Sequence, residues 1–361
     1  MRNEKFWQSR KVFVTGHTGF KGAWLCLWLY YAGASVTGYA LGPPTTPSLF
    51  AQCRVDRLID SRFGDVRDAE SLTKVISLAK PEIIFHLAAQ SLVGESYSVP
   101  RATYEVNVMG TVNLFEAVRR TGNTRAVINV TSDKCYENKE CLRGYREDDP
   151  LGGYDPYSSS KACSELISSA YRNSFFNPRD YELHGVGAAS ARAGNVIGGG
   201  DWAKNRLVPD CMRALLYNER VIIRNPGAVR PWQHVLEPLG GYMTLAEKLC
   251  ENGPAYAEAW NFGPTEDDMK PVEWVVRHIC ARWGRGASYE VKSNMELHEA
   301  RYLKLDSLKA RTRLSWKPKW SLEKAIDRTL QWTFGYEKKE DIREVCLRQI
   351  NDYVNNTVGE R

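Results

Sequence analysis

Five side chains near the middle of the chain have the chemistry to move protons. Ser132, Asp133 and Lys134 are consecutive, and Tyr157 and Lys161 follow them, four residues apart. Residues at that spacing share one face of a helix, so the lysine can act on the phenol. A free phenol has a pKa of roughly 10, and a nearby ammonium favours its anion. The pair could therefore serve as a general base near neutral pH.

A tyrosine and a lysine at this spacing are also common on solvated surfaces, so the surrounding elements decide. An apolar stripe predicts a helix over 158–171. The apolar run 125–130 predicts a strand that ends at Thr131. In open α/β sheets, ligands bind beyond the carboxyl ends of the strands. Ser132, Asp133 and Lys134 therefore fall where a site is expected.

The N-terminal segment has the pattern of a dinucleotide-binding turn. A strand is predicted at 11–14 and an apolar helix at 23–31, with three glycines between them. Such glycines permit close approach to a pyrophosphate, and the helix N-terminus favours anions. The alternative is a turn without a ligand, in which Lys21 is solvated rather than near phosphates. The candidate cofactor contacts in this turn are Gly16, His17, Thr18, Gly19, Phe20, Lys21 and Gly22.

The next strands leave the choice between NAD and NADP undecided by charge. The strand predicted at 35–39 is followed by neither an acidic residue for a ribose hydroxyl nor an arginine for a 2′-phosphate. Asp65 could bind the adenine amine or cap a helix. The segment 83–90 is an apolar strand that turns small and polar at its end, as passage beside a dinucleotide requires.

Composition favours a soluble, cytoplasmic enzyme. A chain of 361 residues with 43% hydrophobic and 25% charged residues can bury a large core. It shows no apolar run of membrane-spanning length and no signal peptide at its start. Nine scattered cysteines fit a reducing compartment, and six unclustered histidines indicate no metal site. The net charge of +6 comes from basic residues interleaved with acidic ones, which argues against nucleic-acid binding.

The order of elements predicts an α/β fold of the Rossmann type. Strands near 11, 35, 58, 83, 126 and 186 alternate with helices, as in a doubly wound parallel sheet. After residue 190 the pattern changes, with a helix expected at 207–217 and a short strand at 221–225. We therefore expect an NAD-binding domain at 1–190 and a smaller, mainly substrate-binding region at 191–361. The boundary is approximate, because the chain can cross between the two parts.

Seven motifs together resemble the extended short-chain dehydrogenase/reductase family, and within it the nucleotide-sugar 4,6-dehydratases. The resemblance spans nearly the whole chain and lies in TGHTGFKG (15–22), GDVRD (64–68), HLAAQ (86–90), NVMGT (107–111), TSDKCY (131–136), YSSSK (157–161) and ARAGNVIGGGDW (191–202). In dehydratases acting on dTDP-glucose and GDP-mannose, glutamate normally follows the aspartate. Here Lys134 follows, as in members that act on CDP-sugars.

The resemblance implies a reaction that ends in a 4-keto-6-deoxy sugar. Tyr157, assisted by Lys161 and Ser132, would take the proton from the hydroxyl at sugar carbon 4 during oxidation. Lys134 would then remove the carbon 5 proton, while Asp133 protonates the hydroxyl that leaves carbon 6. NAD would stay tightly bound, since each turnover regenerates it. In place of the usual glutamate, Lys134 leaves the identity of the carbon 5 base open.

The resemblance also implies binding residues and partners. Further cofactor contacts would come from Asp65, Val66, Leu87, Ala88, Ala89, Asn107, Tyr157 and Lys161. The nucleotide-sugar would contact Gln90, Ser132, Asn195, Arg206, Arg230 and Arg301, because arginine suits a diphosphate. Helices at about 101–120 and 158–176 would form a homodimer, with a tetramer as the other possibility. Deoxysugars for a bacterial surface polysaccharide, such as the O-antigen of lipopolysaccharide, would be the downstream use.

Three other functions fit parts of the pattern. A 4-epimerase of the same family would share the glycine turn and Tyr157–Lys161, but its product would keep the substrate's mass. A dehydratase could prefer dTDP-glucose or GDP-mannose. A non-catalytic NAD-binding protein would show no turnover, and it would not require the tyrosine and lysine.

Overall fold

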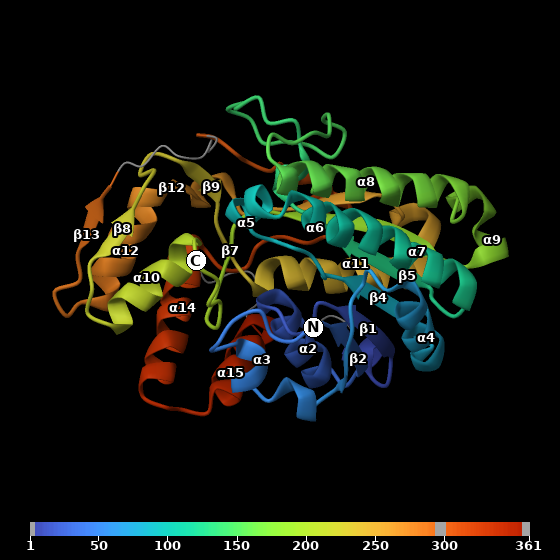
Figure 1. Cartoon of the computed structure of the whole chain (residues 1–361), viewed down its shortest axis with the longest axis horizontal. Helices are drawn as coiled ribbons and strands as arrows, with labels where there is room; N and C mark the ends of the chain where they lie inside the picture. The colour runs from blue at the N-terminus through green and yellow to red at the C-terminus, as the bar shows by residue number, and fades with distance from the viewer. Residues whose placement is uncertain (1–3, 293–300, 356–361) are drawn as a thin grey trace.

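A seven-stranded parallel sheet forms the centre of the protein (Figure 1). The structure is a computed structural model that describes residues 4–292 and 301–355. The strand order is β11-β6-β5-β4-β1-β2-β3. The strands are β1 (Lys11–Thr15), β2 (Ser35–Ala40), β3 (Asp60–Phe63), β4 (Ile83–His86), β5 (Ala126–Val130), β6 (Gly187–Ala193) and β11 (Ala259–Phe262). This order confirms the doubly wound fold. The chain adds β2 and β3 on one side of β1, and then adds β4, β5 and β6 on the other side, so the strand order reverses between β1 and β4.

Helices cover both faces of the sheet, because side chains along each strand alternate between two cores. Val12 and Val14 pack in the core under α2 (Phe20–Tyr31) and α11 (Leu236–Tyr256). Phe13 packs in the opposite core under α4 (Ala69–Ala79) and α7 (Gly110–Thr121). Such strands, buried on both faces, read as continuous apolar runs.

The helix predicted over 101–120 is divided into three parts. It consists of α6 (Pro100–Tyr104), a π-helical turn η2 (Glu105–Met109) and α7. The π turn contains Asn107, which is 2% exposed and faces the end of β4. π-Helical turns occur frequently at functional sites. The second predicted helix is α8 (Pro156–Ser174), which begins earlier than 158 because Asp155 caps it and Pro156 occupies its first turn.

The chain beyond residue 190 builds a second core and also returns to the sheet. The second core joins α10 (Leu207–Leu216), β8 (Val221–Ile223), α12 (Val272–Trp283) and α14 (Leu322–Glu337). The first two match the predicted helix and strand. However, α11 and β11 belong to the central sheet layer. The domain boundary near residue 190 therefore stays a prediction.

Further helices and short strands complete the fold. The remaining helices are α1 (Glu4–Trp7), α3 (Leu49–Gln52), α5 (Val93–Ser98), α9 (Tyr181–His184), α13 (Leu308–Arg313) and α15 (Ile342–Asn355). The remaining strands are β7 (Val196–Ile197), β9 (Val229–Pro231), β10 (Gln233–His234), β12 (Met269–Pro271) and β13 (Tyr289–Val291). Over residues 4–292 and 301–355, no helix has the length and apolarity to cross a membrane. Within the same ranges, no three His, Cys, Asp or Glu side chains are placed to hold a metal ion.

Candidate active site

Thr15, at the end of β1, links this strand to β4, its neighbour at the point where the strand order reverses. Its hydroxyl oxygen accepts hydrogen bonds from the backbone N–H groups of Leu87 and Ala88, both at 3.1 Å. The same hydroxyl shares a 2.7 Å hydrogen bond with Nδ1 of His86. The ends of β1 and β4 are thereby held together at the crevice where α/β sheets bind ligands. The sequence placed Thr15 in the glycine motif but gave no sign of this role.

The glycine turn fits the pyrophosphate of a dinucleotide. Gly16 has a φ of +73°, and a Cβ there would lie 2.7 Å from the backbone nitrogen of Ala88. A Cβ on Gly22 would lie 2.1 Å from the carbonyl oxygen of Gly16. Gly19, at the N-cap of α2, supplies no side chain to bind the first amides of the helix. Those amides and the helix dipole remain available for an anion.

Side chains from this turn lie beside two regions of the protein, namely the strands β2 and β3 and the group of predicted catalytic residues. His17 Nε2 binds Ser61 Oγ at 2.7 Å, and the Thr18 hydroxyl donates to the carbonyl of Leu41 at 2.9 Å. Burial lowers the pKa of His17 to about 4, so its ring is neutral and supports the turn. Lys21 is half-buried and lies beside the predicted catalytic residues instead, since the charges of Lys161 and Asp133 act on it. The cofactor contacts predicted for these side chains stay predictions.

At the end of β3, Asp65 is paired with an arginine. Its carboxylate accepts from Arg67 Nη2 at 2.6 Å and from the Arg67 backbone at 2.9 Å. The helix cap is Asp68, which accepts from Ser71 N at 3.0 Å. Asp68, and not Asp65, therefore caps the helix α4. Adenine binding by Asp65, with Val66 beside it, stays a prediction.

The five proton-moving side chains lie together at the carboxyl edge of the sheet. Ser132 follows β5, and its hydroxyl donates to Asp133 Oδ1 at 2.9 Å. A hydrogen bond also joins Ser132 to the phenol of Tyr157 on α8. Lys161, one turn further along α8, donates from Nζ to the carbonyl of Val130 at 3.2 Å. Ser132, Asp133, Tyr157 and Lys161 are each less than 9% exposed, and Lys134 is half-buried.

Burial moves these groups away from their ordinary charge states. It raises the pKa of Tyr157 to about 12, although the hydrogen bond with Ser132 acts in the opposite direction. It lowers the pKa of Lys161 to about 8, against the charge of Glu165. Burial also raises the pKa of Asp133, and the charge of Lys134 opposes this rise. A carboxyl with a raised pKa is suited to act as a proton donor.

Cationic side chains gather around Asp133. Burial, with Arg206 and Lys161 nearby, lowers the pKa of Lys21 to about 8. Arg206 donates to Asp201 at 3.1 Å and to the hydroxyl of Ser91 at 2.9 Å. It thereby links the turn before α10 to the loop after β4. Asp201 was not among the predicted site residues, although it is the aspartate of the GGGDW motif in the sequence.

The other predicted substrate residues differ in their placement. Arg230, in β9, is 4% exposed, and its charge acts on Asp133. Asn195 directly precedes β7, and its carbonyl accepts from the backbone of Gln233 at 3.0 Å. Arg301 is exposed, with its guanidinium over the ring of Tyr302 at 5.3 Å. The contacts of all three with a substrate stay predictions.

Two predicted binding residues have their side chains committed to the protein. Asn107 donates to the carbonyl of Gln90 at 2.9 Å and to Ser160 Oγ at 2.8 Å, and it accepts from the Gln90 backbone N–H at 2.9 Å. The Gln90 amide donates to Leu92 O at 3.0 Å and to Thr103 Oγ1 at 3.1 Å. Both side chains hold the loop after β4, and their contacts with cofactor and substrate stay predictions.

A Rossmann-type sheet, a glycine turn at its reversal point and a buried Tyr157–Lys161 pair define a short-chain dehydrogenase/reductase. A family model described as GDP-mannose 4,6-dehydratase matches residues 13–329. The chain therefore belongs to this family of nucleotide-sugar dehydratases.

Relatives differ widely in their distance from the chain. A CDP-glucose 4,6-dehydratase from Salmonella typhimurium is 54% identical over 357 residues, which cover 99% of each chain. A dTDP-glucose 4,6-dehydratase from Streptomyces griseus is 28% identical, over 89% of this chain and 93% of the relative. A solved dTDP-glucose 4,6-dehydratase from Bacillus anthracis, in complex with NAD, has a TM-score of 0.76 at 22% identity. It covers 93% of this chain and 100% of its own, and it supports the fold.

Proposed function

We propose that this protein is a hydro-lyase that converts CDP-glucose to CDP-4-keto-6-deoxyglucose and water, with NAD as its cofactor. The observation that carries the proposal is Asp133–Lys134 held with Ser132 and Tyr157 at the carboxyl edge of the sheet. Tyr157 and Lys161 suit oxidation in general, whereas an acid and an amine on one short segment suit water loss. The choice of a CDP-sugar follows the relative that is 54% identical over 99% of the chain.

The reaction begins with oxidation at carbon 4. Tyr157 takes the hydroxyl proton there, with Lys161 and Ser132 favouring its phenolate. Bound NAD would supply the hydride acceptor at carbon 4 and, once reduced, the hydride donor at carbon 6. The new ketone acidifies the carbon 5 proton. We assign the removal of this proton to Lys134. Asp133 gives its proton to the carbon 6 hydroxyl, which departs as water.

Ser132 allows the site to reset its protons. Its hydroxyl is hydrogen-bonded both to Tyr157 and to Asp133. One turnover adds a proton to Tyr157 and removes one from Asp133, while Lys134 returns its proton to carbon 5. A proton passing through the Ser132 hydroxyl restores both groups. The site then needs no proton from solvent between turnovers.

A panel of nucleotide-sugars tests the proposed function. The protein is incubated with CDP-, dTDP-, UDP- and GDP-hexoses, and products are analysed by mass spectrometry. We expect loss of one water, fastest from CDP-glucose. Faster water loss from dTDP-glucose or GDP-mannose would contradict the assigned nucleotide. A product of unchanged mass would identify a 4-epimerase, and an absence of turnover on every sugar would favour a binding protein.

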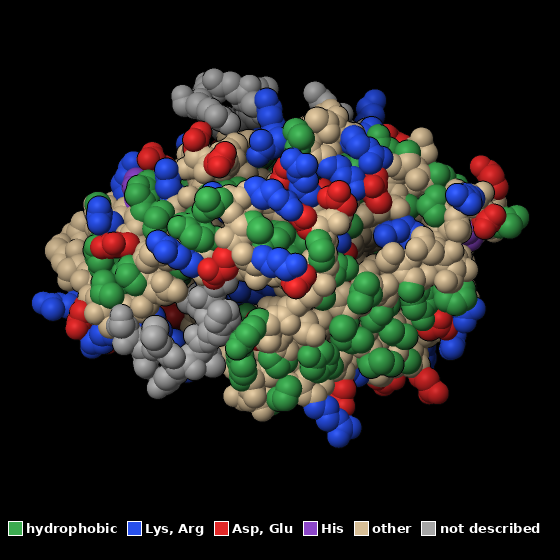
Figure 2. All heavy atoms as spheres, turned by 90° about the horizontal axis from the view of Figure 1, so that it is seen from above, with side chains coloured by type: hydrophobic (Ala, Val, Ile, Leu, Met, Phe, Trp, Pro, Cys, Tyr) green, Lys and Arg blue, Asp and Glu red, His purple; other side chains and the backbone are tan. Residues whose placement is uncertain are grey.

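We further propose a cytoplasmic homodimer. All nine cysteines are free thiols, which suits a reducing compartment. Figure 2 shows hydrophobic side chains gathered on part of one face, and basic side chains interspersed with acidic ones elsewhere on it. The apolar side chains exposed on neighbouring elements α5, α6, η2 and α8 include Tyr97, Tyr104, Met109 and Leu166. Pairing of two copies through these elements would bury them.

A further inference from the structure

One buried ion pair binds both ends of the segment that carries the proposed acid and base. The pair joins Glu165, on α8, to Arg192, on β6, with Oε2 and Nη2 2.8 Å apart. Each side chain is 3% exposed. Glu165 lies one helical turn beyond Lys161, and Arg192 lies near the end of its strand. Neither residue was among the predicted site residues, although the four-residue spacing from Lys161 was a signal for Glu165.

Glu165 holds the first end of the segment 131–136. Its Oε1 accepts a hydrogen bond from the Thr131 hydroxyl, and its Oε2 accepts one from Ser190 at 2.6 Å. Burial alone would raise the pKa of Glu165, but Arg192 and these donors hold it below its usual range. The carboxylate is therefore charged and fully partnered inside the protein.

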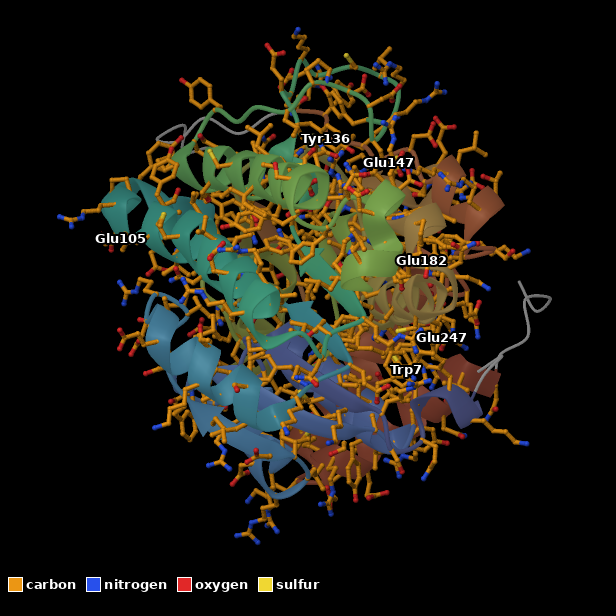
Figure 3. The ribbon with its side chains drawn as sticks, turned by 90° about the vertical axis from the view of Figure 1, so that its right-hand side faces the viewer. Trp7, Glu105, Tyr136, Glu147, Glu182 and Glu247 are labelled. Carbon is orange, nitrogen blue, oxygen red and sulfur yellow. The ribbon has the colours of Figure 1, made fainter. Side chains whose placement is uncertain are left out.

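Arg192 holds the other end of the same segment. Its Nη1 donates to the hydroxyl of Tyr136 at 2.7 Å, and its guanidinium lies 4.9 Å from the centre of that ring. The Tyr136 hydroxyl in turn donates to Asn261, on β11, at 2.7 Å. Figure 3 shows Tyr136 near Glu147, whose backbone carbonyl also accepts from Arg192 at 3.2 Å.

We propose that Glu165 and Arg192 are positioning residues for the elimination of water. They fix Thr131 and Tyr136, and thereby the four residues between them, including Asp133 and Lys134. Ion pairs buried this deeply seldom add net stability, whereas removing one partner is costly, so a role in fixing geometry is consistent with their retention. The inference rests on the proposed function, because it concerns the elimination step of that reaction.

Elimination depends on this segment more than oxidation does. Asp133 and Lys134 must reach two adjacent carbons of one sugar at the same time, and both are carried by the segment. Tyr157 and Lys161 are carried by α8, whose helical hydrogen bonds hold them, and the segment contributes only Ser132 to the oxidation step. A small displacement of reacting groups can slow a reaction about a hundredfold. Loosening either end of the segment should therefore slow water loss more than oxidation.

Two conservative substitutions each release one end. Thr131→Val removes the hydroxyl that binds Glu165, and Tyr136→Phe removes the hydroxyl that binds Arg192. Tyr145→Phe is the matched control, because Tyr145 stacks on Tyr136 at 5.2 Å while its hydroxyl binds Lys139 N and Asn138. Ser190→Ala, which removes one hydrogen bond from Glu165, is a further variant if either of the first two loses its bound cofactor.

The measurements follow the two half-reactions with CDP-glucose. Water loss and exchange of the carbon 5 hydrogen with heavy water are measured by mass spectrometry, and reduced cofactor by its absorbance. We expect water loss and exchange to fall about tenfold or more in the segment variants. Reduced cofactor should then accumulate, while Tyr145→Phe stays at the wild-type level. Unchanged water loss, or an equal slowing of both half-reactions, would overturn the inference. Failure of the wild-type protein to dehydrate CDP-glucose would instead contradict the proposed function.

Discussion

The chemistry of this site depends on which of its side chains hold a proton near neutral pH. Burial raises the pKa of Asp133, which favours the neutral acid needed at carbon 6. Burial also lowers the pKa of Lys161 and of Lys21 to about 8. The site therefore contains ammonium groups that lose their protons more readily than solvated lysines do. Such a set of groups suits acid and base steps within one turnover.

Replacing Lys134 by alanine tests its assignment as the carbon 5 base. We expect water loss to fall by roughly 10²- to 10⁴-fold, the usual contribution of general base catalysis. Oxidation at carbon 4 should persist, because Tyr157 and Lys161 are intact, so reduced cofactor should accumulate. The control is Tyr157→Phe, which should prevent both half-reactions. Water loss at the wild-type rate in Lys134→Ala would show that another group removes the proton.

At the scale of single elements, the site is shaped by close backbone contacts, some of which an added side chain would block. The turn between β1 and α2 brings Gly16 and Gly22 so close to neighbouring backbone that a Cβ on either would clash, and the π-helical turn η2 sets Asn107 against the loop after β4. The strand–turn–helix pattern predicted the first contact from sequence. The π turn was not predictable, because its sequence reads as continuous helix.

Gly22→Ala tests the proposed cofactor turn. The new Cβ would lie 2.1 Å from the carbonyl oxygen of Gly16, so the turn must shift. Strain from overpacking typically costs about 1–3 kcal/mol, which corresponds to roughly fivefold to 150-fold weaker NAD binding. The measurements are the NAD content of the purified protein and titration calorimetry. Gly42→Ala is the control, since no heavy atom lies within 4 Å of its new Cβ. Equal NAD affinity in both variants would argue against the turn as the cofactor site.

Across the whole molecule, the C-terminal region is joined to the sheet layer through a buried carboxyl group. Glu237, on α11, accepts hydrogen bonds from Trp320 N at 2.8 Å and from the Tyr353 hydroxyl at 2.7 Å. It is fully buried, and burial raises its pKa from 4.5 to about 7. The folded protein therefore holds this proton more tightly than the unfolded chain does.

This proton makes stability depend on pH. The contribution of Glu237 is fully present below pH 4.5 and is lost as the pH rises to about 7. The free energy of unfolding of wild type, relative to Glu237→Gln, should fall by about 3 kcal/mol across that range. Denaturant titrations at several pH values measure it, with the surface variant Glu251→Gln as control. A difference that does not change with pH would contradict the raised pKa.

The proposed homodimer is tested by placing a charge in its apolar surface. Leu166, on α8, is 58% exposed, and Leu166→Glu should turn the dimer into a monomer, because burying an unpaired carboxylate is costly. Sedimentation velocity measures the change. Leu183→Glu is the control, on α9, where Leu183 is 87% exposed. A wild-type monomer, or a Leu166→Glu protein that sediments as wild type, would contradict this interface.

The sequence by itself determined the parts of this protein that depend on short-range order. The alternation of strands and helices, the glycine turn and the Tyr157–Lys161 spacing are local patterns, because helix period and turn geometry link residues close in the chain. Only the tertiary structure brought Lys21 beside Asp133, returned β11 to the sheet and set Glu165 and Arg192 at the ends of the segment 131–136. Those contacts join residues distant in sequence, and their partners are selected by packing and by the need to pair buried charges.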